Sequence, residues 1–308
     1  LMNLDRAFTS FFKKRGNFPR FKSRKDNRNS FQCPQKVDVD FNSNLIWLPK
    51  FKNGIKSVFD RQFEGKIKTV TISKTPTNKY FAAVLVEQAG EDPVKPEATE
   101  DKAIGIDLGI KTFATFSDGT KIANPKHLNR RLKKLKREQR KLSRKKKGSK
   151  NRDKQRIKVA RVHEKITNCR KDFLHKLSHE LVCENQATTL CVETLDIKGM
   201  LEKGYKNTNR STNDVGWGTF IEFLNYKCQR YGKNLIKIGR FEASSKTCSC
   251  GKINNSLSLK DRVWKCESCR AEHDRDVLGA QNIRKFAFRE QNTNCESSVS
   301  GNNLVRSD

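Results

Sequence analysis

The sequence has no long hydrophobic run and few acidic residues. No stretch approaches the roughly 18 apolar residues of a membrane helix, and the first residues lack the apolar segment of a secretory signal. Only 34 Asp and Glu accompany 65 Lys and Arg, which leaves a formal net charge of +31. This balance excludes an ordinary soluble enzyme without a polyanionic partner and makes a nucleic acid the expected partner. We therefore expect an intracellular, cytoplasmic protein.

Several common catalytic patterns are also missing. There is no Walker-type phosphate loop and no dinucleotide fingerprint, and Lys176 follows His175 where the metalloprotease pattern ending at His179 needs Glu. The ten Cys occur without a secretory signal, which argues against a disulfide framework. The chain opens on Leu1 and continues like the interior of a helix, so we expect either an N-terminal truncation or a gene read from a non-standard start.

Hydrophobic patterning predicts a small β domain followed by an α/β domain. Residues 1–96 combine a basic, Phe-rich segment with short alternating strands over residues 37–41, 45–48, 66–73 and 80–87. Residues 97–240 predict a mixed α/β sheet with a basic helical hairpin at 125–186 and one helix over 214–231. The remaining segments are a cysteine-rich module at 241–272, a closing helix at 273–290 and a polar, disordered tail at 291–308.

The hairpin carries an unusual excess of positive charge. Between Lys126 and Lys171 there are 22 Lys and Arg and only three acidic residues. A solvated coiled coil needs both signs of charge, so the excess favours a rod that follows a phosphate backbone. The N-terminal Phe residues and cations suit phosphates and unstacked bases, although several of these rings also fit the apolar stripe of a helix. The candidate nucleic-acid contacts are Lys13, Lys14, Arg15, Arg20, Lys22, Arg130, Arg131, Lys134, Arg137, Lys141 and Arg144.

Three carboxylates are candidates for hydrolysis of a phosphodiester. Asp107 and Glu193 lie at the ends of apolar strands, and the alternation around Asp107 puts two glycines on its face, where a ligand backbone can approach. Asp276 shares a helical face with later apolar residues, and Asp274 is expected as the N-cap. Carboxylates of this kind hold two Mg²⁺ ions. The alternative for each is a paired or capping carboxylate without a catalytic role.

The cysteine cluster has the spacing of a structural zinc site. Cys248-Ser249-Cys250 is followed after fifteen residues by Cys266-Glu267-Ser268-Cys269. This inner gap is typical of a four-Cys zinc ribbon, in which every ligand position is filled and no water is bound. The first pair is one residue closer than the usual Cys-x-x-Cys, so zinc binding by that half stays open. His273 is a reserve ligand.

Four motifs occur in a fixed order along the chain. They are Gly105-Ile106-Asp107-Leu108-Gly109-Ile110-Lys111, Val192-Glu193-Thr194-Leu195, Asp214-Val215-Gly216-Trp217-Gly218, and the cysteine cluster followed by Asp274-Arg275-Asp276. This ordered set resembles the TnpB family, the transposon-encoded RNA-guided nucleases related to type V CRISPR effectors. The resemblance covers nearly the whole chain, because segments such as Phe18-Pro19-Arg20-Phe21-Lys22 also match.

The resemblance implies a fold and an activity. The fold is a RuvC-like nuclease domain of the RNase H class, with the helical hairpin and a zinc ribbon as insertions, preceded by a truncated wedge β-barrel and recognition region. The activity is cleavage of double-stranded DNA by Asp107, Glu193 and Asp276 with Mg²⁺, directed by a guide RNA from the transposon end in a bacterial or archaeal host. Base pairing would carry the specificity while the protein supplies a charged channel.

Three other functions stay open at this point. Thr194 and Leu278 depart from the family pattern, and with the short N-terminus they fit a nuclease-silent RNA-guided binder or repressor. A transposase of the RNase H superfamily uses the same kind of carboxylate site for strand transfer. A zinc-ribbon nucleic-acid-binding protein without catalysis leaves Asp107 and Glu193 unexplained.

Overall fold

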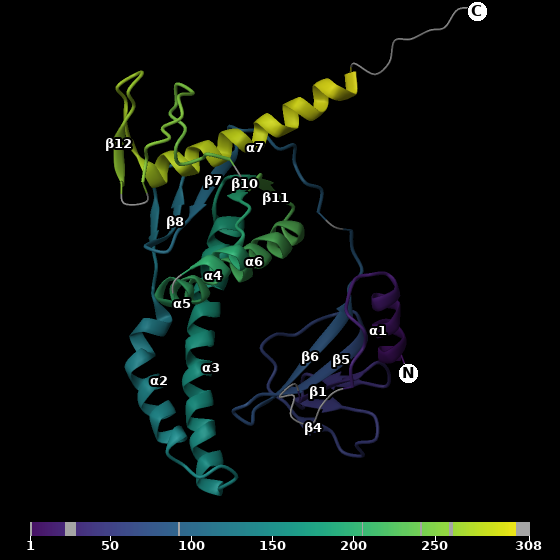
Figure 1. The fold of residues 1–308 in the computed structure, drawn as a ribbon. Coiled ribbons are helices and arrows are strands. Elements are labelled where there is room, and N and C mark those ends of the chain that lie inside the picture. The colour runs from purple at the N-terminus through teal and green to yellow at the C-terminus, as the bar shows by residue number, and fades with distance from the viewer. Residues whose placement is uncertain are drawn as a thin grey trace, which may run out of the picture. The chain divides into compact units, whose positions relative to one another are not determined.

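The computed structural model describes residues 2–21, 29–91, 93–204, 206–240, 242–258 and 261–299 (Figure 1). The chain divides into two compact units. The first comprises Leu1–Gly90 with Lys146–Arg161, and the second comprises Glu91–Lys145 with Val162–Asp308. Among the described residues, no helix combines the length and hydrophobicity needed to cross a membrane.

The first unit contains a helix and two small sheets. Helix α1 (Met2–Phe12) precedes the strands, whose orders are β1-β5-β6 and β2-β3-β4 with antiparallel pairing throughout. A small core of Cys33, Ile46, Leu48 and Val70 lies in these sheets. The four predicted strands are present within two residues, whereas β1 and β4 were not predicted. The strands are β1 (Asn29–Cys33), β2 (Asp38–Asp40), β3 (Leu45–Trp47), β4 (Ile55–Lys56), β5 (Lys66–Lys74) and β6 (Tyr80–Glu87).

The second unit is built on a mixed five-stranded sheet, as the sequence predicted. Its order is β11-β10-β7-β8-β9, in which β7, β10 and β11 are parallel and β8 and β9 form an antiparallel meander beside β7. The middle of the sheet is therefore a pair of parallel strands, β7 and β10, that are far apart in the sequence. The strands are β7 (Ala103–Leu108), β8 (Thr112–Phe116), β9 (Lys121–Ala123), β10 (Thr189–Glu193) and β11 (Asn234–Ile238).

The two faces of this sheet pack against different helices. Ile104, Ile106 and Leu108 of β7 join a large core with side chains of α3 and α6. The opposite face packs on α7 through Ala103 and Cys191, together with three apolar side chains of that helix. The period of two predicted for β7 is therefore confirmed, because consecutive residues of a strand point to opposite faces.

The expected role of the glycine beside Asp107 was wrong. A Cβ on Gly105 would overlap the backbone carbonyl oxygen of Ala280 in α7. The space beside the strand is thus filled by the closing helix and not by a ligand. Gly105 lets α7 lie directly on β7, in the way that a small residue permits close approach of another backbone.

Two long helices form the basic hairpin. Helix α2 (His127–Ser143) and helix α3 (Lys150–His179) flank the predicted turn, and α3 continues into a short π-helical segment, η1 (Glu180–Glu184). The buried apolar side chains of the hairpin include Leu135 on α2 and Val159, Val162, Ile166 and Leu177 on α3.

The predicted helix over residues 214–231 is broken in two. Helix α5 (Lys206–Val215) ends before Gly216, whose φ of 76° is left-handed, and α6 (Trp217–Arg230) begins after it. A short helix α4 (Ile197–Lys203) precedes them. The break turns Asp214 away from α6 toward the base of the hairpin, where it accepts from the backbone N–H of Leu128 at 2.9 Å and pairs with Arg170 at 2.6 Å. Asp214 therefore joins the end of α5 to both helices of the hairpin.

The cysteine module is fixed to the closing helix. Strands β12 (Val263–Lys265) and β13 (Glu272–Asp274) form its hairpin, and α7 (Arg275–Val299) follows at once. Leu278 of α7 is buried with Trp264 and Cys248 in the core of the module, and the Asn282 amide donates to two backbone carbonyls before it, Ser244 and Thr247. In the predicted tail, α7 continues past residue 290 to Val299, and residues 300–308 lie outside the described part of the chain.

Candidate metal centres and basic surface

The three candidate carboxylates come from two neighbouring strands and the helix that covers them. The register that pairs Val192 with Ile106 carries Glu193 and Asp107 one residue further along adjacent parallel strands. Such strands lie about 4.8 Å apart. Asp276 is in the first turn of α7, and a Cβ on Gly279 in the next turn would lie 3.3 Å from Oδ2 of Asp107. The fold thus brings the start of α7 to the end of β7.

The electrostatics of the cluster show that its negative charges interact. The pKa of Asp107 is raised to about 7, first because burial disfavours the charged carboxylate and then because Glu193 and Asp276 repel it; Arg275 opposes this only in part. Burial also raises the pKa of Glu193. A group of carboxylates whose negative charge is only partly offset by arginine, and which offers hard oxygen donors, fits a divalent cation such as Mg²⁺. The three do not form a group of ligand atoms within 4.8 Å of one another, so the cluster is open.

An arginine that the sequence did not single out reaches this cluster. The Arg262 guanidinium lies 3.1 Å from Oδ1 and 3.4 Å from Oδ2 of Asp276. Arg262 immediately precedes β12, so it belongs to the cysteine module and not to the sheet. No sequence signal marked it, because its partner lies fourteen residues later and the two meet only when the β12–β13 hairpin folds back onto α7.

Asp274 acts as the predicted N-cap of the closing helix. Its carboxylate accepts from the backbone N–H groups of Asp276 at 3.0 Å and Val277 at 3.1 Å, and it pairs with Lys121 of β9 at 2.6 Å. These contacts satisfy otherwise free amides at the start of α7. The Asp274 carboxylate therefore has a structural role as a helix cap and ion-pair partner. Asp107, in contrast, has no cation within hydrogen-bonding distance among the described residues.

The four cysteines form a compact ligand set. The sulfurs of Cys248, Cys250, Cys266 and Cys269 all lie within 4.8 Å of one another. Cys248 and Cys269 are 3.5 Å apart and Cys250 and Cys266 are 3.7 Å apart, which is close to the ~3.8 Å edge of a tetrahedron with Zn–S bonds of about 2.3 Å. The shortened Cys248-Ser249-Cys250 pair therefore still delivers both sulfurs, and the cluster can hold a zinc ion.

Backbone amides and one histidine support the sulfurs. The N–H groups of Cys269 and Ser268 donate to Cys266 and lower the pKa of its thiol to about 6, whereas burial raises the pKa of Cys248 to about 12. Nε2 of His273 lies 3.0 Å from the sulfur of Cys248. His273, which the sequence suggested as a reserve ligand, thus contacts the sulfur of Cys248, as the hydrogen-bonding partners of metal ligands do.

The hairpin presents its cations in a groove along α2. A hollow of about 510 Å³ is lined by basic side chains alone, namely Lys133, Lys136, Arg137, Arg140, Lys141 and Arg144. Arg137, Lys141 and Arg144 were predicted, and Lys133, Lys136 and Arg140 were not. Glu138 is turned inward between Arg137 and Lys141 and is buried, so it does not interrupt the groove.

The other candidate contacts are distributed more loosely. Arg130 and Lys134 are exposed, while Arg131 is half-buried and its guanidinium lies 3.5 Å from the sulfur of Cys169 on α3. In the first unit, Lys13, Lys14, Arg15 and Arg20 are exposed after α1, and Lys22 lies outside the described residues.

Comparison with known proteins identifies relatives over most of the chain. Residues 83–204 match the family model described as "Probable transposase", and residues 217–283 match the Cas12f1-like TNB domain. A protein of Streptomyces pristinaespiralis named as an RNA-guided DNA endonuclease is 42% identical over 286 residues, which cover 92% of this chain and 69% of that protein. InsQ of Escherichia coli (strain K12), named in the same way, is 33% identical over 92% of this chain and 72% of its own length.

A solved structure shares the fold. The structure of the Cas12f1-sgRNA-target DNA complex matches with a TM-score of 0.54 at 14% identity, over 92% of this chain and 69% of that one. The fold described above is therefore found in a known structure. The match to that structure and the matches to the two relatives each cover 92% of this chain. This chain belongs to the TnpB family, whose members are named RNA-guided DNA endonucleases.

Proposed function

We propose that this protein is an RNA-guided endonuclease that hydrolyses DNA phosphodiesters at Asp107, Glu193 and Asp276. The observation that carries the proposal is the repulsion of Asp107 by Glu193 and Asp276, which together with burial raises the pKa of Asp107 to about 7. A structural carboxylate normally finds a cation or a cap, as Asp274 and Asp214 do. Three acids gathered with only one of them, Asp276, in an ion pair among the described residues are typical of a site that binds metal ions.

Asp107, Glu193 and Asp276 would hold a pair of Mg²⁺ ions through their oxygens. When bound, the metal pair supplies an activated water and neutralises charge on the scissile phosphate and the leaving oxygen. The protein's own part is to hold the carboxylates apart on rigid elements, with β7 and β10 fixed by their register and Asp276 fixed by the capped start of α7. Arg262 keeps the Asp276 carboxylate oriented from the side of the zinc module.

The expected partners are a guide RNA from the transposon end and double-stranded target DNA. The names of the two relatives support an RNA-guided mode of action. The α2 groove supports contact with a phosphate backbone and not with base edges, because six cations line it and no acceptor does. Guide pairing carries specificity in such a system, so a charged groove without base-reading groups is what the protein has to provide.

The finer fold assignments belong to the same proposal. The antiparallel meander followed by two parallel strands supports a RuvC-like core of the RNase H class over residues 97–240, closed by residues 273–290. The antiparallel sheets of the first unit support a wedge-like barrel over residues 1–96, and the cysteine module supports a zinc ribbon over residues 241–272.

The test is cleavage by the reconstituted complex. The full chain is purified with its bound RNA, that RNA is sequenced, and a linear DNA matching its guide segment is incubated with the complex and Mg²⁺. We expect defined cuts with the wild type and intact DNA with Asp107→Ala, which should still copurify with the RNA and shift the target DNA. Full cutting by Asp107→Ala, or covalently joined product from labelled transposon ends, would contradict the proposal.

A further inference from the structure

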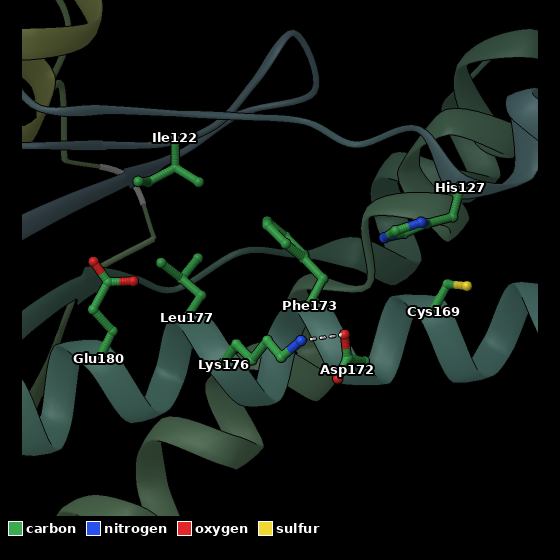
Figure 2. Close-up of a pocket in the computed structure, with 8 residues that line it drawn as sticks. All are labelled: Ile122, His127, Cys169, Asp172, Phe173, Lys176, Leu177 and Glu180. Atoms are coloured by element: carbon green, nitrogen blue, oxygen red, sulfur yellow. Dashed lines mark ion pairs between the residues drawn. The ribbon is translucent and has the colours of Figure 1, made fainter.

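A second pocket lies on the hairpin away from the basic groove. It has a volume of about 400 Å³ and is formed where β9 and the start of α2 face α3 (Figure 2). Its apolar walls are Ile122 of β9 and Phe173 and Leu177 of α3. Figure 2 shows His127 at one end with its ring toward Phe173, and Glu180 at the other end below Ile122. The result is a slot with apolar sides and a polar group at each end.

One of these polar groups has no partner. Nε2 of His127 is buried and has no hydrogen-bond partner among the described residues. The pKa of His127 is lowered because of burial, with further lowering from Arg130, Arg131 and Arg170 against the opposing effect of Asp214. The ring is therefore neutral near pH 7, and its Nε2 can accept or donate depending on the tautomer. A buried nitrogen of this kind costs free energy until a partner fills the position.

Charge separates the inside of the slot from its surroundings. Within it, Glu180 carries negative charge and Asp172 is paired with Lys176 at 3.0 Å, so a phosphate group is disfavoured there. Arg130 and Arg131 lie close enough to influence His127 and belong to the same helix as the basic groove. Lys133, the first residue of that groove, follows His127 by six residues, or about 9 Å along α2.

We propose that this pocket receives one unstacked nucleobase from the nucleic acid whose backbone lies in the α2 groove. A base is flat, uncharged and apolar on its faces, with donors and acceptors at its edges. It therefore fits a slot with Phe173 and Leu177 as walls and with His127 and Glu180 at the ends, while its phosphates stay with the arginines outside. The inference rests on the nucleic-acid binding proposed above but not on cleavage.

The experiment maps where a base lies. The full chain is irradiated with a 12-nucleotide oligouridylate that carries one 4-thiouridine, or with the DNA counterpart that carries 4-thiothymidine, and adducts are located by mass spectrometry. We expect adducts on His127, Cys169 or Phe173. The adduct yields with the RNA and DNA oligonucleotides are compared, and the oligonucleotide with the greater yield shows which kind of strand supplies the base.

Two variants and a control test the assignment. Ile122→Trp fills the slot and His127→Ala removes the unpartnered nitrogen, and each should lower the yield at the slot by at least about fivefold, the effect of losing one stacked base. Lys136→Gln, in the basic groove, should weaken overall binding and leave the share of adducts at the slot unchanged. Thermal melting shows whether each variant is folded, and the wild-type map decides the question alone if one is not.

Two results would overturn the inference. Adducts confined to the Phe-rich N-terminal segment or to the part of α2 after His127 would place the base elsewhere, and the proposed function would still stand. Undiminished adducts at the slot in Ile122→Trp would show that the cavity is not needed. A chain that binds neither oligonucleotide overturns both this inference and the proposed function.

Discussion

The cysteine cluster and the carboxylate cluster differ in how their ligand atoms are brought together. The four sulfurs come from 22 residues and two tight turns, and all lie within 4.8 Å of one another. The three carboxylates are Asp107 on β7, Glu193 on β10 and Asp276 on α7. They are far apart in the sequence, and they form no such compact group. The first cluster is closed around one position, while the second is open between rigid elements. A closed site holds an ion for stability, whereas an open one leaves room for a substrate.

Their electrostatics differ in the same way. Backbone N–H groups lower the pKa of Cys266 to about 6 and so favour the charged form of that ligand, while burial raises the pKa of Cys248 to about 12. Burial and two neighbouring acids raise the pKa of Asp107 to about 7, so the protein disfavours the charged ligand until a cation arrives. The cysteine module is thus prepared for its metal by local turns, and the carboxylates are held by the fold at a cost in stability.

The largest expected effect comes from removing the central carboxylate. Asp107→Ala should lower DNA cleavage by at least about a thousandfold, because one of the three carboxylates that would hold the metal ions is lost. Its zinc content should equal that of the wild type, since the cysteine cluster does not depend on β7. Cleavage rates and zinc analysis on the same preparation check this. A variant that loses both would show that the two clusters are not independent.

The converse change should remove zinc. Cys266→Ser takes away a buried sulfur of a four-ligand site, and competition with a chelator should show a zinc affinity at least about a hundredfold weaker. Cys183→Ser, at an exposed cysteine outside the module, is the matched control and should keep full zinc binding. Equal zinc affinity in Cys266→Ser and Cys183→Ser would refute the four-sulfur site.

The pH dependence of stability tests how much the charged form of the buried Asp107 destabilises the folded protein. Because its folded pKa is raised from 3.8 to about 7, its favourable contribution is complete below pH 3.8 and is lost as the pH rises through 7. Asp107→Asn does not titrate, so in EDTA it should be more stable than the wild type at pH 8, by up to about 4 kcal/mol, and equal to it near pH 4. Chemical denaturation at the two pH values measures this. A variant less stable at pH 8 would contradict the assignment.

A compensated carboxylate should respond with the opposite sign. Asp214 is buried, pairs with Arg170 and accepts from the start of α2. Asp214→Asn should therefore destabilise the protein at pH 8, by about 2 kcal/mol, since it weakens a charge pair whose arginine is partly exposed. Unfolding curves of Asp107→Asn and Asp214→Asn recorded together give this contrast in sign. Destabilisation of both by the same amount would remove the distinction between the two carboxylates.

Features that depend on residues close together in the sequence could be predicted, whereas contacts between distant residues could not. The alternation around Asp107 in β7 was predicted because alternation is local, and the cysteine cluster was predicted because its spacing is local. Asp107 and Glu193 could be proposed from their strands, but their meeting depends on a register between strands more than eighty residues apart. Arg262 was missed for the same reason, since nothing near it in the sequence indicates Asp276 as its partner.

The wrong predictions also have physical reasons. The helix over 214–231 was read as continuous because its apolar pattern is continuous, yet Gly216 adopts a left-handed conformation that ends α5. Gly105 was assigned to a ligand because a glycine on a strand face indicates close approach, but only the packed structure shows that α7 is the neighbour. Strand β1 was missed because its sequence, Asn29–Cys33, has little alternation and is stabilised by pairing with β5.

The most direct test of the carboxylate site is anomalous diffraction from crystals of the protein grown with Mn²⁺ in place of Mg²⁺. The account predicts two manganese peaks about 4 Å apart, bounded by Asp107, Glu193 and Asp276, and no peak there in Asp107→Ala. Absence of manganese from this position in the wild type, with the protein otherwise folded as described, would contradict it.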